Sequence, residues 1–206
     1  MEIVTLGKDL GGCVLKASGI LRHGGVIIFP TDTLYGLGAD ALSDEAVAKI
    51  YGVKGRNEGK PMHAIFANLE MAAEYAEIND AAIKLAKKFL PGALTLVLKK
   101  KKGVDTGIVK GIDTIGMRIP DNDFCLDLAK TFGKPYTATS ANKAGSPPQL
   151  SSKKVLEQLG RNAEQVDLVV DDGLLPMRLP TTVVNVVSDY PVILREGAIP
   201  PREILG

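Results

Sequence analysis

Short apolar runs and helical patterns alternate along the whole length of this 206-residue chain. Residues 26–29 (VIIF) are typical of a buried strand, and apolar residues three or four apart between 14 and 21 indicate a helix. Such alternation is typical of an α/β domain. Strand patterns cluster at 166–170, 182–187 and 192–194, so we expect a mixed sheet with some antiparallel pairs.

The remaining patterns fill the chain without a linker or an internal repeat, which predicts a single domain over residues 1–206. Ser43, followed by Asp44 and Glu45, is expected to cap the start of a helix. Further strands are expected at 62–67, 94–98, 114–119 and 136–139, and further helices at 83–90, 124–132 and 151–159.

Composition excludes several classes of protein. Lys and Arg number 25 and Asp and Glu 24, so a net charge of +1 argues against a dedicated DNA binder. Two cysteines and two histidines are too few for a disulfide framework or a structural zinc site, and we expect no metal ligands from the protein. Residues 1–9 are too polar for a signal peptide, and no apolar run approaches the roughly 20 residues that span a bilayer. A cytoplasmic location is therefore expected.

Four segments carry polar residues that a core does not need. Residues 30–38 (PTDTLYGLG) follow a buried strand, where open α/β sheets place ligand-binding loops. The alternative is a plain turn whose hydroxyls cap local backbone groups. Residues 54–63 hold Lys54, Arg56 and Lys60 among glycines, which suits phosphate oxygens, or else they form a solvated basic loop.

The third segment, residues 137–145, runs from a strand into Ser140 and Asn142. These short side chains could orient a nucleoside, or they could form an N-cap or an Asx turn. The fourth consists of residues 180–185 together with 194–197, where a basic residue follows a strand and precedes a glycine.

Two basic features have two interpretations each. Arg118 interrupts an apolar strand pattern, so it must pair with a carboxylate, either of the protein or of a ligand. The run Lys99 to Lys102 is typical of a solvated hairpin tip, and the alternative is an electrostatic footprint for RNA. His63 taken alone is typical of a structural histidine.

The order of six motifs resembles the YrdC/YciO family, the threonylcarbamoyl-AMP synthases. The match runs from about Gly24 to Ala198, inside a motif-bearing core of about residues 12–198. The motifs are PTDTxYGLG from Pro30, KxR at Lys54 and Arg56, PGxLT from Pro91, GMRIP from Gly116, SxN at Ser140 and Asn142, and REGA from Arg195. Two stretches depart from the family pattern, Lys143-Ala144-Gly145 and Thr181 to Asn185. The YciO-like branch often lacks KxR and SxN, so their presence favours the synthase branch.

The resemblance implies a twisted open mixed sheet with helices around it and a large, basic, concave cavity. It also implies a nucleotidyltransferase that converts L-threonine, bicarbonate and ATP into threonylcarbamoyl-AMP and pyrophosphate. A separate tRNA-modifying transferase would place the threonylcarbamoyl group on the adenosine next to the anticodon.

Residue roles follow from the same resemblance. Lys54 and Arg56 are the expected catalytic residues, and they would bind ATP together with Ser140, Asn142 and Arg195. Mg²⁺ would bridge the phosphate oxygens. The expected threonine-binding residues are Thr31, His63, Arg118 and Thr181, with the guanidinium fork of Arg118 matching the substrate carboxylate.

Two alternatives stay open. The same fold could be a double-stranded RNA or tRNA-binding protein without synthase activity, with the lysine run at the rim of its cavity. It could also be a carbamoyl-handling domain like those of hydrogenase-maturation proteins, although those belong to much longer chains with zinc-finger-like cysteines.

Overall fold

A computed structural model describes residues 1–55 and 62–206. Its strands are β1 (Glu2–Thr5), β2 (Ile27–Pro30), β3 (Tyr35–Gly38), β4 (His63–Ile65), β5 (Leu94–Lys99), β6 (Thr114–Arg118), β7 (Tyr136–Ser140), β8 (Leu168–Asp171), β9 (Thr182–Asn185) and β10 (Val192–Arg195). Within the described residues these ten strands form one sheet in the order β1-β8-β2-β3-β7-β4-β6-β5-β9-β10. Strand β2 pairs with β8 in parallel and with β3 in antiparallel orientation, which confirms the predicted mixed sheet.

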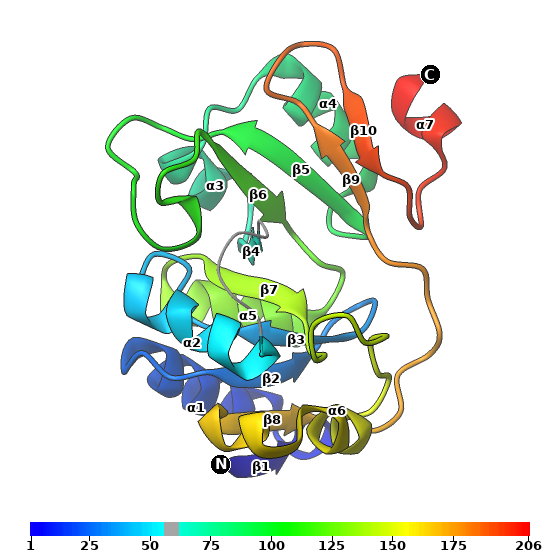
Figure 1. Cartoon of the computed structure of the whole chain (residues 1–206). Helices are drawn as coiled ribbons and strands as arrows, with labels where there is room; N and C mark the ends of the chain where they lie inside the picture. The colour runs from blue at the N-terminus through cyan, green and yellow to red at the C-terminus, as the bar shows by residue number, and fades with distance from the viewer. Residues whose placement is uncertain (56–61) are drawn as a thin grey trace.

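Helices surround the sheet (Figure 1). They are α1 (Leu10–Arg22), α2 (Asp44–Lys54), α3 (Leu69–Tyr75), α4 (Asp80–Phe89), α5 (Asp123–Phe132), α6 (Ser152–Leu159) and α7 (Pro201–Leu205), with short 3-10 turns at η1 (Leu6–Lys8), η2 (Gly107–Val109) and η3 (Gly160–Gln165). In Figure 1 the strands β1, β8, β2, β3 and β7 lie in the lower part with α1, α2, α5 and α6, and β5, β6, β9 and β10 lie in the upper part with α3, α4 and α7. The chain ends at opposite ends of the molecule.

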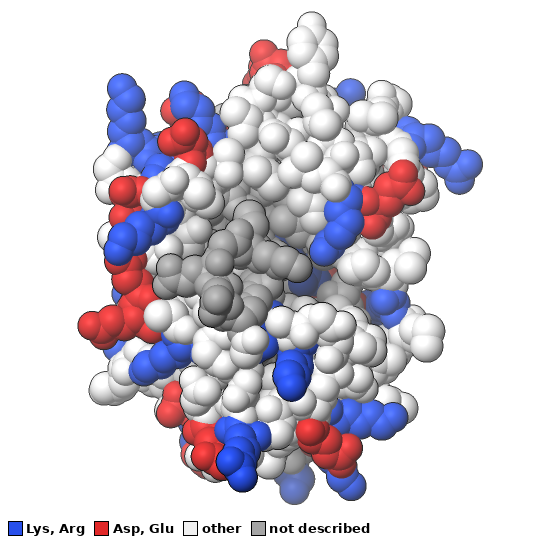
Figure 2. Space-filling view, viewed as in Figure 1, with Lys and Arg blue, Asp and Glu red and all other residues white. Residues whose placement is uncertain are grey.

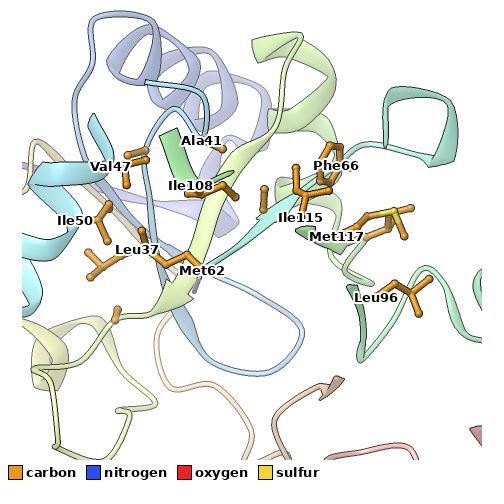
Figure 3. Packing of buried hydrophobic residues seen from close by; sticks show 14 of the residues in the cluster. Leu37, Ala41, Val47, Ile50, Met62, Phe66, Leu96, Ile108, Ile115 and Met117 are labelled. Carbon is orange, nitrogen blue, oxygen red and sulfur yellow. The ribbon is translucent and has the colours of Figure 1, made fainter. Parts of the chain in front are cut away.

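Strand β2 shows how the sequence builds two cores. Successive side chains of a strand point to opposite faces of the sheet. Ile27 and Phe29 accordingly pack with α1 and α5, whereas Val26 and Ile28 belong to the larger cluster on the other face. Figure 3 shows part of that larger cluster, where side chains of several elements converge: Leu37, Ala41, Val47, Ile50, Met62, Phe66, Leu96, Ile108, Ile115 and Met117.

Several predicted boundaries are confirmed by their capping groups. The hydroxyl of Ser43 accepts a hydrogen bond of 3.2 Å from the backbone N–H of Ala46 at the start of α2. Gly133 ends α5 in the left-handed conformation at φ 80°, as its position after the helical pattern predicts. None of the helices in the described part of the chain is both long and apolar enough to cross a membrane.

Some elements and part of one segment differ from the predictions. Strand β1 and helices α3 and α7 are not predicted by the sequence patterns, and residues 30–38, expected to form a loop, include the strand β3. Residues 35–38 are the strand β3, because a glycine at 36 and at 38 leaves room for the ring of Phe29 across the hairpin. A Cβ at Gly38 would lie 2.9 Å from that ring.

Candidate functional site

A small pocket opens where segments distant in sequence meet. Its volume is about 160 Å³. The described residues that line it are Thr31, Thr33, Leu34, Gly36, Met62, His63, Arg118, Ala138, Thr139, Ser140, Pro180, Thr181 and Arg195. They come from the turn after β2, the strands β3, β4, β6 and β7, the segment before β9 and the end of β10. All four threonine-binding candidates, and two of the ATP-binding candidates, therefore share one pocket.

The hydroxyl of Thr31 organises the turn that follows β2. Its hydroxyl accepts hydrogen bonds from the N–H groups of Thr33 and Leu34, at 3.1 and 3.2 Å, and donates to the carbonyl of Leu34 at 2.8 Å. The side chain thus caps the tight turn between β2 and β3 while it lines the pocket. These bonds hold the turn in the shape that presents its hydroxyls to the pocket.

His63 is the first residue of β4 and lies opposite Gly116 of β6. A Cβ at position 116 would lie 2.8 Å from the Cβ of His63, so the glycine lets β4 and β6 approach closely at this pair. Burial, followed by the positive charges of Arg118 and Arg195, lowers the pKa of His63 to about 3. The ring is therefore neutral near pH 7, and its buried Nε2 has no hydrogen-bond partner among the described residues. His63 therefore lines the pocket, with a neutral ring.

Arg118 obtains its carboxylate partner from the protein. Its side chain is 5% exposed, and its Nη2 forms an ion pair with Asp32 and donates to the hydroxyl of Thr33 at 2.9 Å. The buried Nε has no partner among the described residues. The sequence patterns predict no role for Asp32, although an arginine inside an apolar strand indicates that a carboxylate, of the protein or of a ligand, must lie nearby.

Arg195 reaches the pocket from the other half of the sheet. Its Nη2 donates to the carbonyl and the hydroxyl of Thr181, at 2.8 and 3.0 Å. The hydroxyl of Thr181 also lies 2.9 Å from that of Thr95 in β5. Burial and the nearby charge of Arg118 lower the pKa of Arg195 from its usual value. Two arginines thus face one pocket, and only Arg118 has a carboxylate partner in the described part of the chain.

Lys54, Ser140 and Asn142 lie together and form hydrogen bonds with one another. Lys54 ends α2 and is 3% exposed. Its Nζ donates to the Ser140 carbonyl, and to the carbonyl and side-chain oxygen of Asn142 at 3.1 Å each. The hydroxyl of Ser140 donates to the same side-chain oxygen. Ser140 lines the pocket, whereas Lys54 supports the turn beside it. The predicted partner Arg56 lies outside the described residues.

The lysine run after β5 is engaged in local ion pairs. Lys99 lies 3.0 Å from Glu77, and Lys100 lies 2.6 Å from Asp105. Strands β5 and β6 pair antiparallel, which agrees with the hairpin that the run predicted. Figure 2 shows basic and acidic side chains interspersed over one face, with basic atoms also visible in a recess near its middle.

Comparisons with known proteins agree on the relatives of this chain. The family model Sua5_yciO_yrdC, described as telomere recombination, matches residues 19–197. The threonylcarbamoyl-AMP synthase of Pyrococcus abyssi is 39% identical over 91% of this chain and 55% of its own length. A putative threonylcarbamoyl-AMP synthase of Methanocaldococcus jannaschii is 37% identical over 89% of this chain and 85% of its own length.

A solved structure of P. abyssi Sua5 complexed with L-threonine resembles the whole fold. The TM-score is 0.88 at 35% identity, and the match covers 98% of this chain and 59% of that one. The chain thus spans little more than half the length of the P. abyssi protein.

Proposed function

Because the chain belongs to the Sua5/YciO/YrdC family, we propose that it converts L-threonine, bicarbonate and ATP into threonylcarbamoyl-AMP and pyrophosphate. The observation that carries the proposal is the convergence of His63, Arg118 and Arg195 on one small polar pocket. The likeness to a Sua5 structure that holds L-threonine supports it.

The pocket suits the amino acid better than the nucleotide. Its volume of about 160 Å³ lies below the roughly 300–1,000 Å³ of typical small-molecule sites. Arg118 would bind the threonine carboxylate, while Thr31, His63 and Thr181 complete the amino-acid site. Because the Nη2 of Arg118 already donates to Asp32 and Thr33, the carboxylate would use the other donors of the guanidinium in place of the full fork.

ATP would lie against the neighbouring turn of Ser140 and Asn142, with Arg195 facing its phosphates. Lys54, whose Nζ donates to that turn, would contribute its positive charge and hold the turn in place. Arg56 of the KxR motif is the further candidate for the phosphates. The described residues include no group of three or more His, Cys, Asp or Glu side chains that could hold a metal ion, and none of the described pocket-lining residues is acidic. Mg²⁺ usually keeps several waters and is held by substrate phosphates, so it would enter here as part of the nucleotide substrate.

The proposed reaction brings anionic groups together, and this requires positively charged side chains. Bicarbonate first takes up a proton and loses water to give carbon dioxide. The nitrogen of the threonine amine then bonds to the carbon of carbon dioxide and releases one proton to solvent, which gives a carbamate. A carbamate oxygen then forms a bond to the α-phosphorus of ATP while the bond to the pyrophosphate oxygen breaks. Both reacting groups are anionic, so positioning and charge stabilisation lower the barrier. We assign no general base, because the carbamate can form from dissolved carbon dioxide.

The product would supply a transferase that modifies the tRNA adenosine next to the anticodon. We place this reaction in the cytoplasm, where two buried free cysteines are in keeping with a reducing compartment. The RNA-binding alternative has less support, because Lys99 and Lys100 already pair with carboxylates of the protein.

The test is pyrophosphate release from ATP, with L-threonine and bicarbonate omitted in turn. We expect release only when all three substrates are present, together with a nucleotide product that contains threonine. Release that continues without threonine would identify a simple ATP hydrolase and refute the proposal, as would no release from the complete mixture.

A further inference from the structure

Asp32 lies at the centre of a buried network next to the pocket. Its side chain is 3% exposed. One carboxylate oxygen pairs with Arg118, and the other accepts the backbone N–H of Asp121 at 3.3 Å. Its backbone carbonyl accepts a hydrogen bond of 3.0 Å from Arg178, in the connection that leads to β9. Two other segments of the chain thus fix where this carboxylate lies.

The network determines which donors of Arg118 remain for a ligand. Both protons of Nη2 have acceptors, one on Asp32 and one on Thr33. These two bonds set the plane of the guanidinium, since its nitrogens are coplanar. The Nε of Arg118 stays buried and unpartnered in the described part of the chain, as does the Nε2 of His63. Buried polar atoms without partners are rare in native proteins, and here both belong to residues that line the same pocket.

We infer that Asp32 is a positioning residue: it holds the guanidinium of Arg118 in the orientation that receives the substrate carboxylate. This inference rests on the proposed function. Asp32 is not among the described residues that line the pocket, so we assign it no direct contact with the substrate. Its effect passes through the two N–H groups of Nη2.

A positioning role and a charge role predict opposite results. The Asp32 carboxylate offsets the charge of Arg118, so its charge alone would weaken the binding of an anionic substrate. If that charge dominated, neutralising Asp32 would strengthen threonine binding. If orientation dominates, the same change weakens binding, because Arg118 loses the contact that fixes its plane.

The decisive variant is Asp32→Asn. Arg118 and the N–H of Asp121 use different oxygens of the carboxylate, and a carboxamide replaces one of these oxygens with an NH₂ group, so one of the two donors would face another donor. We expect the KM for L-threonine to rise about tenfold or more, in line with the cost of misplacing a binding group, with the KM for ATP unchanged. An unchanged or lower KM for threonine, or an equal rise for both substrates, overturns the inference.

Asp40→Asn is the matched control. Asp40 also divides its two oxygens between a cation and a backbone N–H, at 2.6 Å from Lys134 and 2.9 Å from the nitrogen of Leu42, and it lies outside the pocket lining. We expect this variant to leave both KM values unchanged. If Asp32→Asn does not fold, Asp32→Glu keeps the charge but moves the carboxylate by one methylene, and it should raise the threonine KM in the same way. A silent Asp32→Glu variant would overturn the inference.

Calorimetric titration of L-threonine separates this inference from the proposed function. A wild-type protein that binds threonine without releasing pyrophosphate would refute the function alone, and weaker threonine binding by Asp32→Asn would still support the role of Asp32. A wild-type protein that binds no threonine refutes both.

Discussion

At the residue scale, His63 is the most strongly perturbed group that faces the pocket. Its neutral ring lies between two arginines, and burial removes the water that would stabilise a positive imidazolium. A neutral imidazole can donate at one nitrogen and accept at the other, which suits a ligand that carries an amine and a hydroxyl. The same perturbation links the pocket to the stability of the fold.

The lowered pKa of His63 predicts acid sensitivity. Above about pH 6.5 the histidine is neutral in both the folded and the unfolded chain, so it does not change the stability with pH. Between about 6.5 and the folded pKa of about 3, the unfolded chain binds a proton that the folded one does not, and stability falls as pH falls. We expect His63 to account for up to about 2 kcal/mol of the unfolding free energy lost by pH 5.

Urea denaturation of the wild type and His63→Gln at pH 7.5 and pH 5 measures this effect. The wild type should lose more stability between these pH values than the variant does. Equal losses in the two proteins would mean that His63 titrates normally in the folded state.

Lys54 is predicted to contribute to both stability and activity. Replacing it with Met keeps the aliphatic stem but leaves acceptors of the Ser140 turn without their donor. Because each buried acceptor left without a partner costs about 1–3 kcal/mol, we expect Lys54→Met to lower the unfolding free energy by that order and to reduce pyrophosphate release strongly.

Lys49→Met is the matched control in the same helix. Lys49 donates to the carbonyl of Gly24 at an exposed position, at 2.7 Å. We expect this variant to differ from the wild type by less than about 0.5 kcal/mol and to keep full activity. Normal activity in Lys54→Met would remove Lys54 from the mechanism.

At the element scale, the pocket depends on close packing between the ends of β9 and β10. Gly197 follows Arg195 and lies against the segment that precedes β9. A Cβ at position 197 would lie 2.3 Å from the carbonyl oxygen of Pro180 and 2.5 Å from the carbonyl carbon of Thr181. The glycine of the REGA motif therefore lets Arg195 and Thr181 approach within hydrogen-bond distance.

Gly197→Ala should separate these two segments. We expect it to lower the unfolding free energy by about 1–3 kcal/mol, as overpacking does, and to raise the KM for threonine because Thr181 moves.

Gly19→Ala in α1 is the control, since a methyl group at that position would meet no neighbouring atom within 4 Å. This variant should stabilise the protein by about 0.5–1 kcal/mol. Thermal unfolding and steady-state kinetics of both variants test the prediction, and a stable, fully active Gly197→Ala would contradict it.

Elements with a clear hydrophobic period could be predicted from the sequence, whereas elements that are short or rich in glycine could not. The apolar runs at β2 and β5 and the capped helices α2 and α5 carry their own signals. Strand β3 consists of Tyr-Gly-Leu-Gly, and glycine is unfavourable in strands. Its strand conformation depends on pairing with β2 and β7, while its glycines leave space for the ring of Phe29. Helices α3 and α7 span seven and five residues, too short for a clear helical period.

At the scale of the whole molecule, charges of both signs are distributed over the surface and partly cancel. Net charge is +1, and Figure 2 shows basic and acidic side chains interspersed on the same face. Tight RNA binding through phosphates requires many cations on one surface. The basic groups that we propose to act, Lys54, Arg118 and Arg195, lie at or beside the pocket instead.

We therefore expect binding of purified tRNA to be weak and non-specific. At 150 mM salt the Kd should be in the range of about 10⁻⁴–10⁻⁶ M typical of non-specific binding, and it should weaken steeply with added salt. Filter binding over a salt series measures this. A nanomolar Kd that persists at this salt concentration would favour the RNA-binding alternative.

The sequence by itself determined the alternation of helices and strands, the mixed sheet and the segments from which the pocket residues come, because local periodicity and short motifs carry that information. Tertiary structure alone decided which polar groups are partners. Arg118 and Asp32 are 86 positions apart, and so are Thr95 and Thr181. A buried arginine pairs with a carboxylate of the protein only if the folded sheet places one beside it. Local sequence patterns cannot predict contacts between residues so far apart in the chain.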